Sequence, residues 1–175
     1  WRNLTEGLIR AVVLVLYITA VSYVPDIKRV FAYHGAEHKV IHTYEAGQEL
    51  TVENARPKTT LHPRCGTSFL LFVVIVSAIV FSFLGEQTIA MRLLSRILLL
   101  PVVAGISYEL IKISGKNQSF FLWRALSWPG LMLQRLTTRE PDDSQLEVAI
   151  MALKQVLALE QNNNLIFPQK DKMHL

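Results

Sequence analysis

The side chains best suited to chemistry in this chain are histidines and a single cysteine. Four of the five histidines and the cysteine fall within 32 residues, in the segments YHGAEHKVIHTYE (33–45) and LHPRC (61–65). A helix through the first segment places four candidate ligands on one face, with Glu37 at its border: His34, His38, His42 and Glu45. Two imidazoles at i,i+4 spacing can chelate one ion, as in zinc-binding helices. The pattern therefore predicts a metal site.

One ion cannot bind all three helix histidines, because His34 and His42 would lie about 12 Å apart along a helix axis. The chelating pair is His34/His38 or His38/His42, and further ligands must come from outside the helix. His62 and Cys65 are the natural suppliers, since a His-x-x-Cys spacing can ligate a metal from a loop. Imidazole and thiolate together favour zinc. The alternative is that these histidines are hydrogen-bonded at a polar membrane interface.

A catalytic hypothesis comes from HGAEH (34–38), which matches the H-x-x-E-H pattern of inverted zinc peptidases. Glu37 would then be the catalytic base of a metal-dependent hydrolase. The rival hypothesis is a non-enzymatic factor in membrane-protein biogenesis or complex assembly, in which the metal fastens the 25–65 loop onto the hairpin formed by the apolar runs 66–84 and 89–111. Closed four-ligand coordination favours the rival, and an open position favours the enzyme. No glycine-rich phosphate loop and no pattern for specific nucleic-acid recognition accompany the histidines.

The elements that must position these residues suit a membrane. The chain is 51% hydrophobic and 18% charged, with a mean hydropathy of +0.29, which is too apolar for a soluble domain of 175 residues. Three runs could span a bilayer: Leu4–Val24, Gly66–Leu84 and Ile89–Ile111. The second carries no charge and would cross about 30 Å of hydrocarbon. We therefore predict an all-α, polytopic membrane protein with about three transmembrane helices, the last two forming a hairpin.

Charged side chains inside these spans need partners. Glu6 and Arg10 lie one helical turn apart and can form an ion pair. Arg96 would lie about 10 Å inside the third span, where an unpaired guanidinium is costly. We expect it to meet an acidic or carbonyl partner, either Glu6, Glu86 or a group of another chain.

The C-terminal part is predicted to hold an interfacial segment and a cytoplasmic helix, together residues 119–160. Tryptophans beside arginines in 119–136 suit the headgroup region, with a break at Pro129-Gly130. Packing on a neighbouring helix fits the same residues. Ser144 and Glu147 are spaced as a capping box for the next helix, whose apolar stripe should pack on the protein's own core: Leu146, Ala149, Ile150, Leu153 and Leu157. Residues 161–175 are predicted to form a disordered tail.

Lysine and arginine positions set the expected topology. They gather in the loop 25–65 and after the third span, so both parts should be cytoplasmic and the N-terminus outside. That orientation fits a fragment lacking an upstream span. Residues 1–118 would then form the transmembrane region with its histidine-rich loop. A net charge of +4 and a pI near 9.3 suit an anionic membrane surface, and the expected partners are the lipid bilayer, other membrane proteins, a translocon or a ribosome.

Several linked motifs resemble the YqhQ-like family of bacterial and plastid membrane proteins. They are YHGAEHKVIHTYEAG, LTVEN, LHPRCGTSF and RLTTREPDDSQLEVAI, which agree in order and spacing over about residues 8–160. The family is described as predicted metal-dependent enzymes of unknown function, so the resemblance implies a metal site but no substrate. Members are often longer, with a soluble N-terminal part and an earlier span. The resemblance also implies a bacterial inner membrane or a plastid membrane, with the histidine loop in the cytoplasm or stroma.

Overall fold

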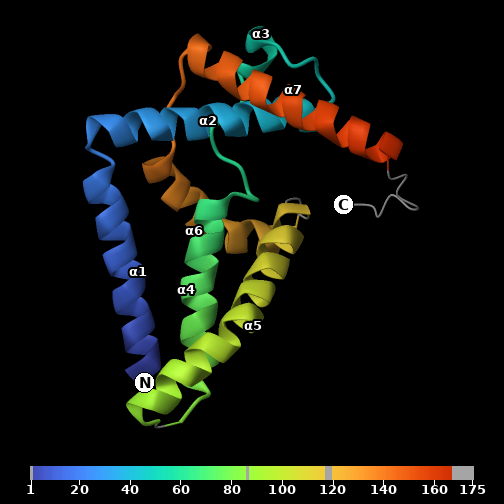
Figure 1. Ribbon diagram of the computed structural model, residues 1–175. Coiled ribbons are helices and arrows are strands. Elements are labelled where there is room, and N and C mark those ends of the chain that lie inside the picture. The colour runs from blue at the N-terminus through green and yellow to red at the C-terminus, as the bar shows by residue number, and fades with distance from the viewer. Residues whose placement is uncertain (1, 86, 117–119, 167–175) are drawn as a thin grey trace. The chain divides into compact units, whose positions relative to one another are not determined.

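The structure is a computed structural model that describes residues 2–85, 87–116 and 120–166 (Figure 1). Within these residues it contains helices and no strand, which confirms the all-α class. The helices are α1 (Arg2–Val21), α2 (Pro25–Glu45), α3 (Val52–Ala55), α4 (Gly66–Ser82), α5 (Ile89–Lys116), α6 (Phe121–Thr137) and α7 (Asp143–Ile166). They belong to two compact units, each built from two chain segments: residues 1–31 with 61–139, and residues 32–60 with 140–175.

The first unit is organised around α4, which packs against α1, α5 and α6. Figure 1 shows α4 between α1 and α5. Phe72 and Val76 are the buried apolar side chains of α4. Gly7 of α1 lies against Ala78 so closely that a Cβ at position 7 would collide with the alanine side chain. The predicted hairpin of α4 and α5 is confirmed, since these two helices follow one another and pack together.

Only one of the three predicted spans meets the requirements for crossing a membrane by itself. Among the described residues, α5 is long and apolar enough: an 18-residue stretch within Ile89–Gly115 has a mean hydropathy of 1.9, and 6% of that stretch is buried. The first run passes only as a pair with α2, and the chain bends sharply between the two helices. The 17 residues of α4 reach about 25 Å, short of the roughly 30 Å of hydrocarbon. The three-span prediction is therefore not confirmed.

An ion pair joins α1 to α5. Arg96 Nη2 donates to Glu6 Oε2 at 3.3 Å, and Arg10 Nη2 approaches the same oxygen at 3.4 Å. The Arg96 guanidinium also lies over the Phe81 ring, 5.7 Å from its centroid. The predicted partner of Arg96 is thus confirmed as Glu6, on a helix of the same unit.

Helix α6 runs without interruption from Phe121 to Thr137, so the predicted break at Pro129-Gly130 is wrong. Proline removes one backbone hydrogen bond of the helix, but tertiary packing holds the helix together around it. Gly130 lies directly against α4, where an added Cβ would be 2.5 Å from Ser68 Oγ. Packing on a neighbouring helix, the other prediction for this segment, is what the structure shows.

The second unit has its own core between α2, α3 and α7. The predicted loop 25–65 contains the first two of these helices. The core residues are Ala36, Val40, Ala55, Leu146 and Ile150, with Leu50, Val52, Ala149 and Leu153 packed around them. The apolar stripe of α7 therefore covers the protein's own core, as predicted. After α2, Gly47 adopts a φ of +65°, which glycine tolerates best and which ends the helix.

The start and end of α7 differ from the prediction. The capping box is Asp142/Gln145 rather than Ser144/Glu147: Gln145 N donates to Asp142 Oδ1 at 2.9 Å, and Asp142 N donates to Gln145 Oε1 at 3.0 Å. Ser144 instead donates to the Asp142 carboxylate at 2.7 Å. The helix continues to Ile166, six residues into the predicted tail, because extending a formed helix is far easier than starting one. The remaining tail residues, 167–175, lie outside the described part.

Candidate metal centre

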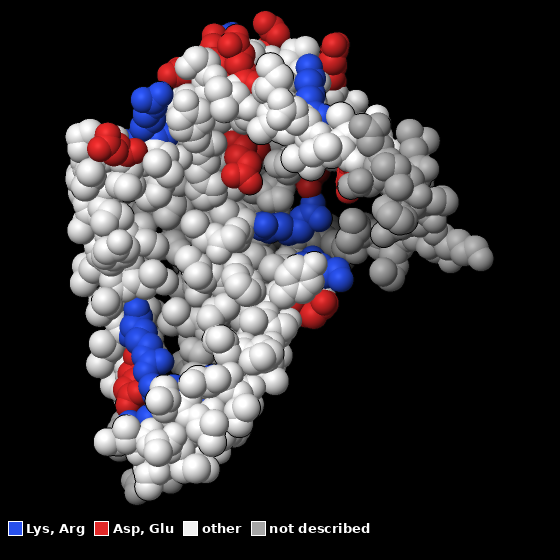
Figure 2. Space-filling view, in the orientation of Figure 1, with Lys and Arg blue, Asp and Glu red and all other residues white. Residues whose placement is uncertain are grey.

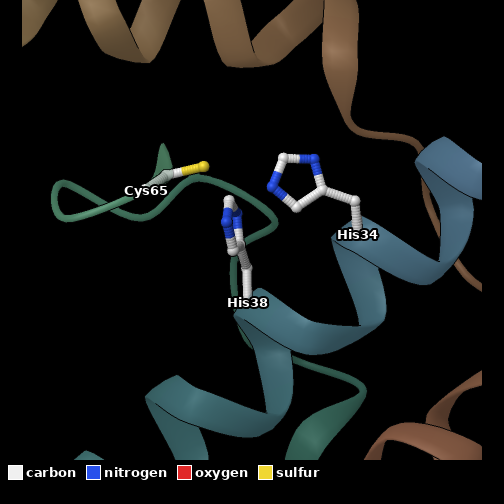
Figure 3. Close-up of side chains that lie close together, drawn as sticks. All are labelled: His34, His38 and Cys65. Carbon is white, nitrogen blue, oxygen red and sulfur yellow. The ribbon is translucent and has the colours of Figure 1, made fainter. Parts of the chain in front are cut away.

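The histidine segment is a continuous helix, which places His34 and His38 on one face as predicted. Pro25 occupies the first helical position, where its missing N–H costs nothing, and Asp26 lies in the first turn, where the helix dipole favours a carboxylate. The rings of His34 and His38 lie edge to face, with their centroids 4.4 Å apart. Figure 3 shows both side chains extending from successive turns of α2 toward the same side. The first chelating pair thus exists within the second unit.

The protonation of His38 is set by a backbone carbonyl. Its Nδ1 lies 2.5 Å from the carbonyl oxygen of Thr60, a residue of the same unit. A carbonyl oxygen can only accept, so Nδ1 must carry the proton, and in the neutral ring the lone pair is on Nε2. Histidines that bind a metal through Nε2 usually donate from Nδ1 to a carbonyl or carboxylate in this way. This hydrogen bond therefore favours the His38 tautomer whose Nε2 lone pair is available.

The loop that carries His62 and Cys65 belongs to the first unit and is fixed by Gln134 of α6. The His62 backbone N–H donates to Gln134 Oε1 at 2.8 Å, and Gln134 Nε2 donates to the His62 carbonyl at 2.7 Å. The same amide nitrogen donates to Ser68 Oγ at 2.8 Å. Gln134 is fully buried, so its amide ties the loop both to α6 and to the start of α4.

His62 and Cys65 present different groups. The Arg64 backbone N–H donates to His62 Nδ1 at 3.3 Å, so this ring accepts at Nδ1 and its proton is on Nε2, the reverse of His38. Cys65 is the N-cap of α4, and its sulfur accepts from the Thr67 N–H at 3.4 Å. Figure 3 shows its side chain in the loop. Hydrogen bonds from a helix N-terminus favour the thiolate, the form of cysteine that binds a metal.

The remaining predicted residues lie further along α2 or on another side of it. His42 is one turn beyond His38, and Glu45 is the last residue of the helix. Glu37 is exposed and lines an apolar groove between α2 and α7. The second unit therefore carries His34, His38, His42 and Glu45 along α2, and the first unit carries His62 and Cys65.

Sequence patterns did not predict two residues that hold the elements of their units in place. Gln134 is one, and its only signal is a lone amide within the apolar run LMLQRL. Lys39 is the other: its side chain is 4% exposed, and its Nζ donates to the Arg56 carbonyl at 2.7 Å and pairs with Glu140 at 2.5 Å. This lysine joins α2 to the end of α3 and to the segment that precedes α7. No sequence pattern predicts this role.

A second ion pair closes the same unit at its surface. Arg56 donates to both carboxylate oxygens of Asp143, at 3.2 Å and 2.7 Å. These hydrogen bonds raise the pKa of the Arg56 guanidinium above its ordinary value, and the attraction of the Asp143 charge is the second cause of the increase. Both side chains are more than half exposed, so the pair fixes geometry more than it stabilises the fold.

The sequence of this all-α chain also matches the model of a described family. The chain belongs to the family described as "Protein of unknown function (DUF1385)", which matches residues 1–159. A relative in this family is the "Uncharacterized protein YqhQ" of Bacillus subtilis (strain 168), which is 45% identical over 155 residues. This alignment covers 89% of the present chain and 49% of the relative, so the chain spans about half the relative's length. No solved structure matches the chain.

The comparisons confirm the resemblance to the YqhQ-like family. Neither description names a metal, a substrate or a reaction. A function for this protein must therefore be inferred from its own side chains.

Proposed function

We propose that this chain is an integral membrane protein that holds a zinc-type ion on the histidine face of α2. The observation that carries the proposal is the hydrogen bond from His38 Nδ1 to the Thr60 carbonyl, which leaves the lone pair on Nε2. The adjacent ring of His34 supplies a second imidazole at chelating spacing.

The chemistry of the donors fits zinc and favours Cys65 over His62 as the third ligand. Two imidazoles and a thiolate are a donor set that zinc prefers. We assign Cys65 as the third ligand because its sulfur accepts hydrogen bonds at the start of a helix. His62 is a poorer candidate, since its proton is on Nε2. The proposed ligands are therefore His34, His38 and Cys65, and the predicted alternatives are His42 and His62.

The role of the ion depends on Glu37. A metal with an open position supplies a Lewis acid and an acidified water, which is the basis of the hydrolase hypothesis. That hypothesis needs Glu37 as a base, and this side chain lines the groove toward α7. Its location favours the second candidate function, a non-enzymatic biogenesis or assembly factor in which the ion fixes the 32–60 segment. Substitution of Glu37 by Gln should then leave the metal content unchanged.

Membrane integration is supported by the exposure of apolar side chains. A core helix of a soluble protein is mostly buried, whereas α5 is 6% buried over its apolar window. The exposed side chains include Leu93, Ile97 and Leu98 of α5 and Leu8, Ile9 and Leu16 of α1. Lipid would cover this surface. The proposed location is a bacterial inner or plastid membrane, with the α2 histidines on the cytoplasmic or stromal side.

The metal proposal is tested by elemental analysis of the detergent-solubilised chain purified without chelators. The wild type should carry about one zinc per chain. His38→Ala and Cys65→Ser should each lower the zinc content at least ten-fold. His62→Ala is the matched control, and it should retain the metal. Equal zinc loss in His38→Ala and His62→Ala, or absence of metal from the wild type, would contradict the proposed ligand set.

A further inference from the structure

The two compact units carry opposite net charges, which the overall charge of +4 conceals. The first unit holds twelve basic and four acidic residues, a net charge of +8. The second holds six basic and ten acidic residues, a net charge of −4. Figure 2 shows acidic side chains gathered over α2, α3 and α7. The second unit would thus be repelled by anionic lipid or nucleic acid and attract cationic partners.

The same unit has an open apolar groove. Helices α2 and α7 run side by side in the same direction (Figure 1), and between them lies a cavity of about 370 Å³. Its apolar walls include Val40 and Ile41 from α2 and Val148, Ala152 and Val156 from α7. Val148 and Val156 are 54% and 57% exposed, so the unit leaves apolar surface uncovered here.

One acidic side chain lines this groove, and two others follow groove residues by one helical turn. Glu37 forms part of its wall, and within the described residues it makes no ion pair or hydrogen bond. Glu45 follows Ile41 by one helical turn on α2, and Glu160 follows Val156 by one turn on α7. The negative end of the α2 dipole, at Glu45, adds to the attraction for a cation at that end.

We propose that the α2–α7 groove binds a basic amphipathic helix of a partner protein. Its apolar side chains, spaced at i and i+4, would enter the cavity, as in other helix-in-groove complexes. Its lysines or arginines would form ion pairs with Glu37, Glu45 and Glu160. This inference is independent of the metal site, because none of the groove residues is a proposed ligand.

The experiment uses the full chain in nanodiscs of zwitterionic phosphatidylcholine, with empty nanodiscs as the background. The probe is a fluorescein-labelled, 18-residue peptide of leucine and lysine with all leucines on one helical face. Its counterpart carries glutamate in place of lysine. Fluorescence anisotropy should give a Kd for the lysine peptide at least ten-fold lower than for the glutamate peptide. Its binding should weaken as sodium chloride is raised, because salt screens surface charges.

Variants locate the site. Glu37→Lys and Ala152→Trp should each weaken binding of the lysine peptide at least ten-fold, the first by charge reversal and the second by filling the cavity. Met151→Trp is the matched control: it is an exposed neighbour that does not line the groove, and it should bind like the wild type. Glu37 is exposed, so its substitution tests the site without disturbing the core.

Three results would overturn the proposal. The first is equal binding of the lysine and glutamate peptides, which would remove the role of charge. The second is unchanged binding in Ala152→Trp, which would place the peptide elsewhere. The third is a ten-fold rise in affinity on deleting residues 167–175, which would make the chain's own end the occupant.

Discussion

Gln134 illustrates how one buried amide can determine the geometry of a loop that carries candidate ligands. It satisfies the N–H and C=O of His62 and the hydroxyl of Ser68 at once. Backbone groups of a loop that are buried without a partner cost free energy. The conformation of the His62–Cys65 segment within its unit therefore depends on a helix more than sixty residues away in the sequence.

Gln134→Leu should destabilise the protein by about 2–5 kcal/mol, because three buried partner groups lose their hydrogen bonds and each costs about 1–3 kcal/mol when unsatisfied. Thermal unfolding followed by tryptophan fluorescence measures the loss. Gln155→Leu makes the same change at an exposed position of α7 and should stay within about 0.5 kcal/mol of the wild type. Similar melting temperatures for the two variants would show that Gln134 holds nothing in place.

Lys39→Met should loosen the second unit by about 1–3 kcal/mol. The Arg56 carbonyl would lose its donor, whereas Glu140 is 71% exposed at its side chain and can be solvated instead. Hydrogen exchange of peptides from residues 140–160 should accelerate roughly ten-fold for each 1.4 kcal/mol lost. Lys154→Met, at an exposed position of α7, is the control. If both variants exchange at the same rate, the buried ion pair is dispensable.

The candidate ligands could be predicted from residue type and spacing, but their protonation could not. The i,i+4 histidines are a local pattern, and α2 reproduces it. The tautomer of His38 depends on the Thr60 carbonyl, 22 residues further along the chain. The tautomer of His62 depends on the local path of the loop. Contacts of this kind follow from tertiary structure, and no local sequence pattern encodes them.

At the level of elements, the apolar runs predicted the helices correctly where hydropathy alone determines where a helix forms. The α4–α5 hairpin follows directly from two apolar runs and a short link. The prediction was wrong where packing overrides local preference. Pro129 and Gly130 are both helix breakers in isolation, yet α6 passes through them because Gly130 allows close contact with Ser68.

Gly130→Ala should therefore separate α6 from α4 and cost about 1–3 kcal/mol, as overpacking usually does. The added Cβ would lie 2.5 Å from Ser68 Oγ and 2.7 Å from Ser68 Cβ. Gly105→Ala in α5 is the matched control, since nothing lies within 4 Å of the added atom. That variant should be neutral or stabilised by up to about 1 kcal/mol. Thermal unfolding of both variants in detergent distinguishes packing from helix propensity, and a stabilised Gly130→Ala would contradict the packing argument.

For the whole molecule, composition suggested a basic protein, and the structure divides that charge between two units of opposite sign. The division could not be predicted, because each unit combines segments far apart in the sequence. The histidine helix and α7 share a core although about a hundred residues separate them. A charge count over a continuous stretch of sequence therefore combines residues of both units.

The membrane proposal predicts that the full chain stays in the pellet when membranes are washed with sodium carbonate near pH 11. Ile97→Lys combined with Leu98→Lys should release part of the chain, since each lysine at the centre of a span costs about 2.5–3.5 kcal/mol. Both positions are exposed on α5. Met151→Lys on α7 should not change the extraction. Complete release of the wild type by carbonate would make the chain a peripheral protein.

The interleaved path of the chain has a consequence for its synthesis. The core of the second unit joins Ala36 and Val40 to Leu146 and Ile150, and residues 61–139 of the first unit are encoded between these two segments. A ribosome adding about 5–20 residues per second would need roughly 5–20 seconds to reach α7 after completing α2. During that interval the apolar face of the histidine helix lacks the cover that Leu146 and Ile150 of α7 give it, so a nascent chain stalled before residue 140 should be a preferred client of chaperones.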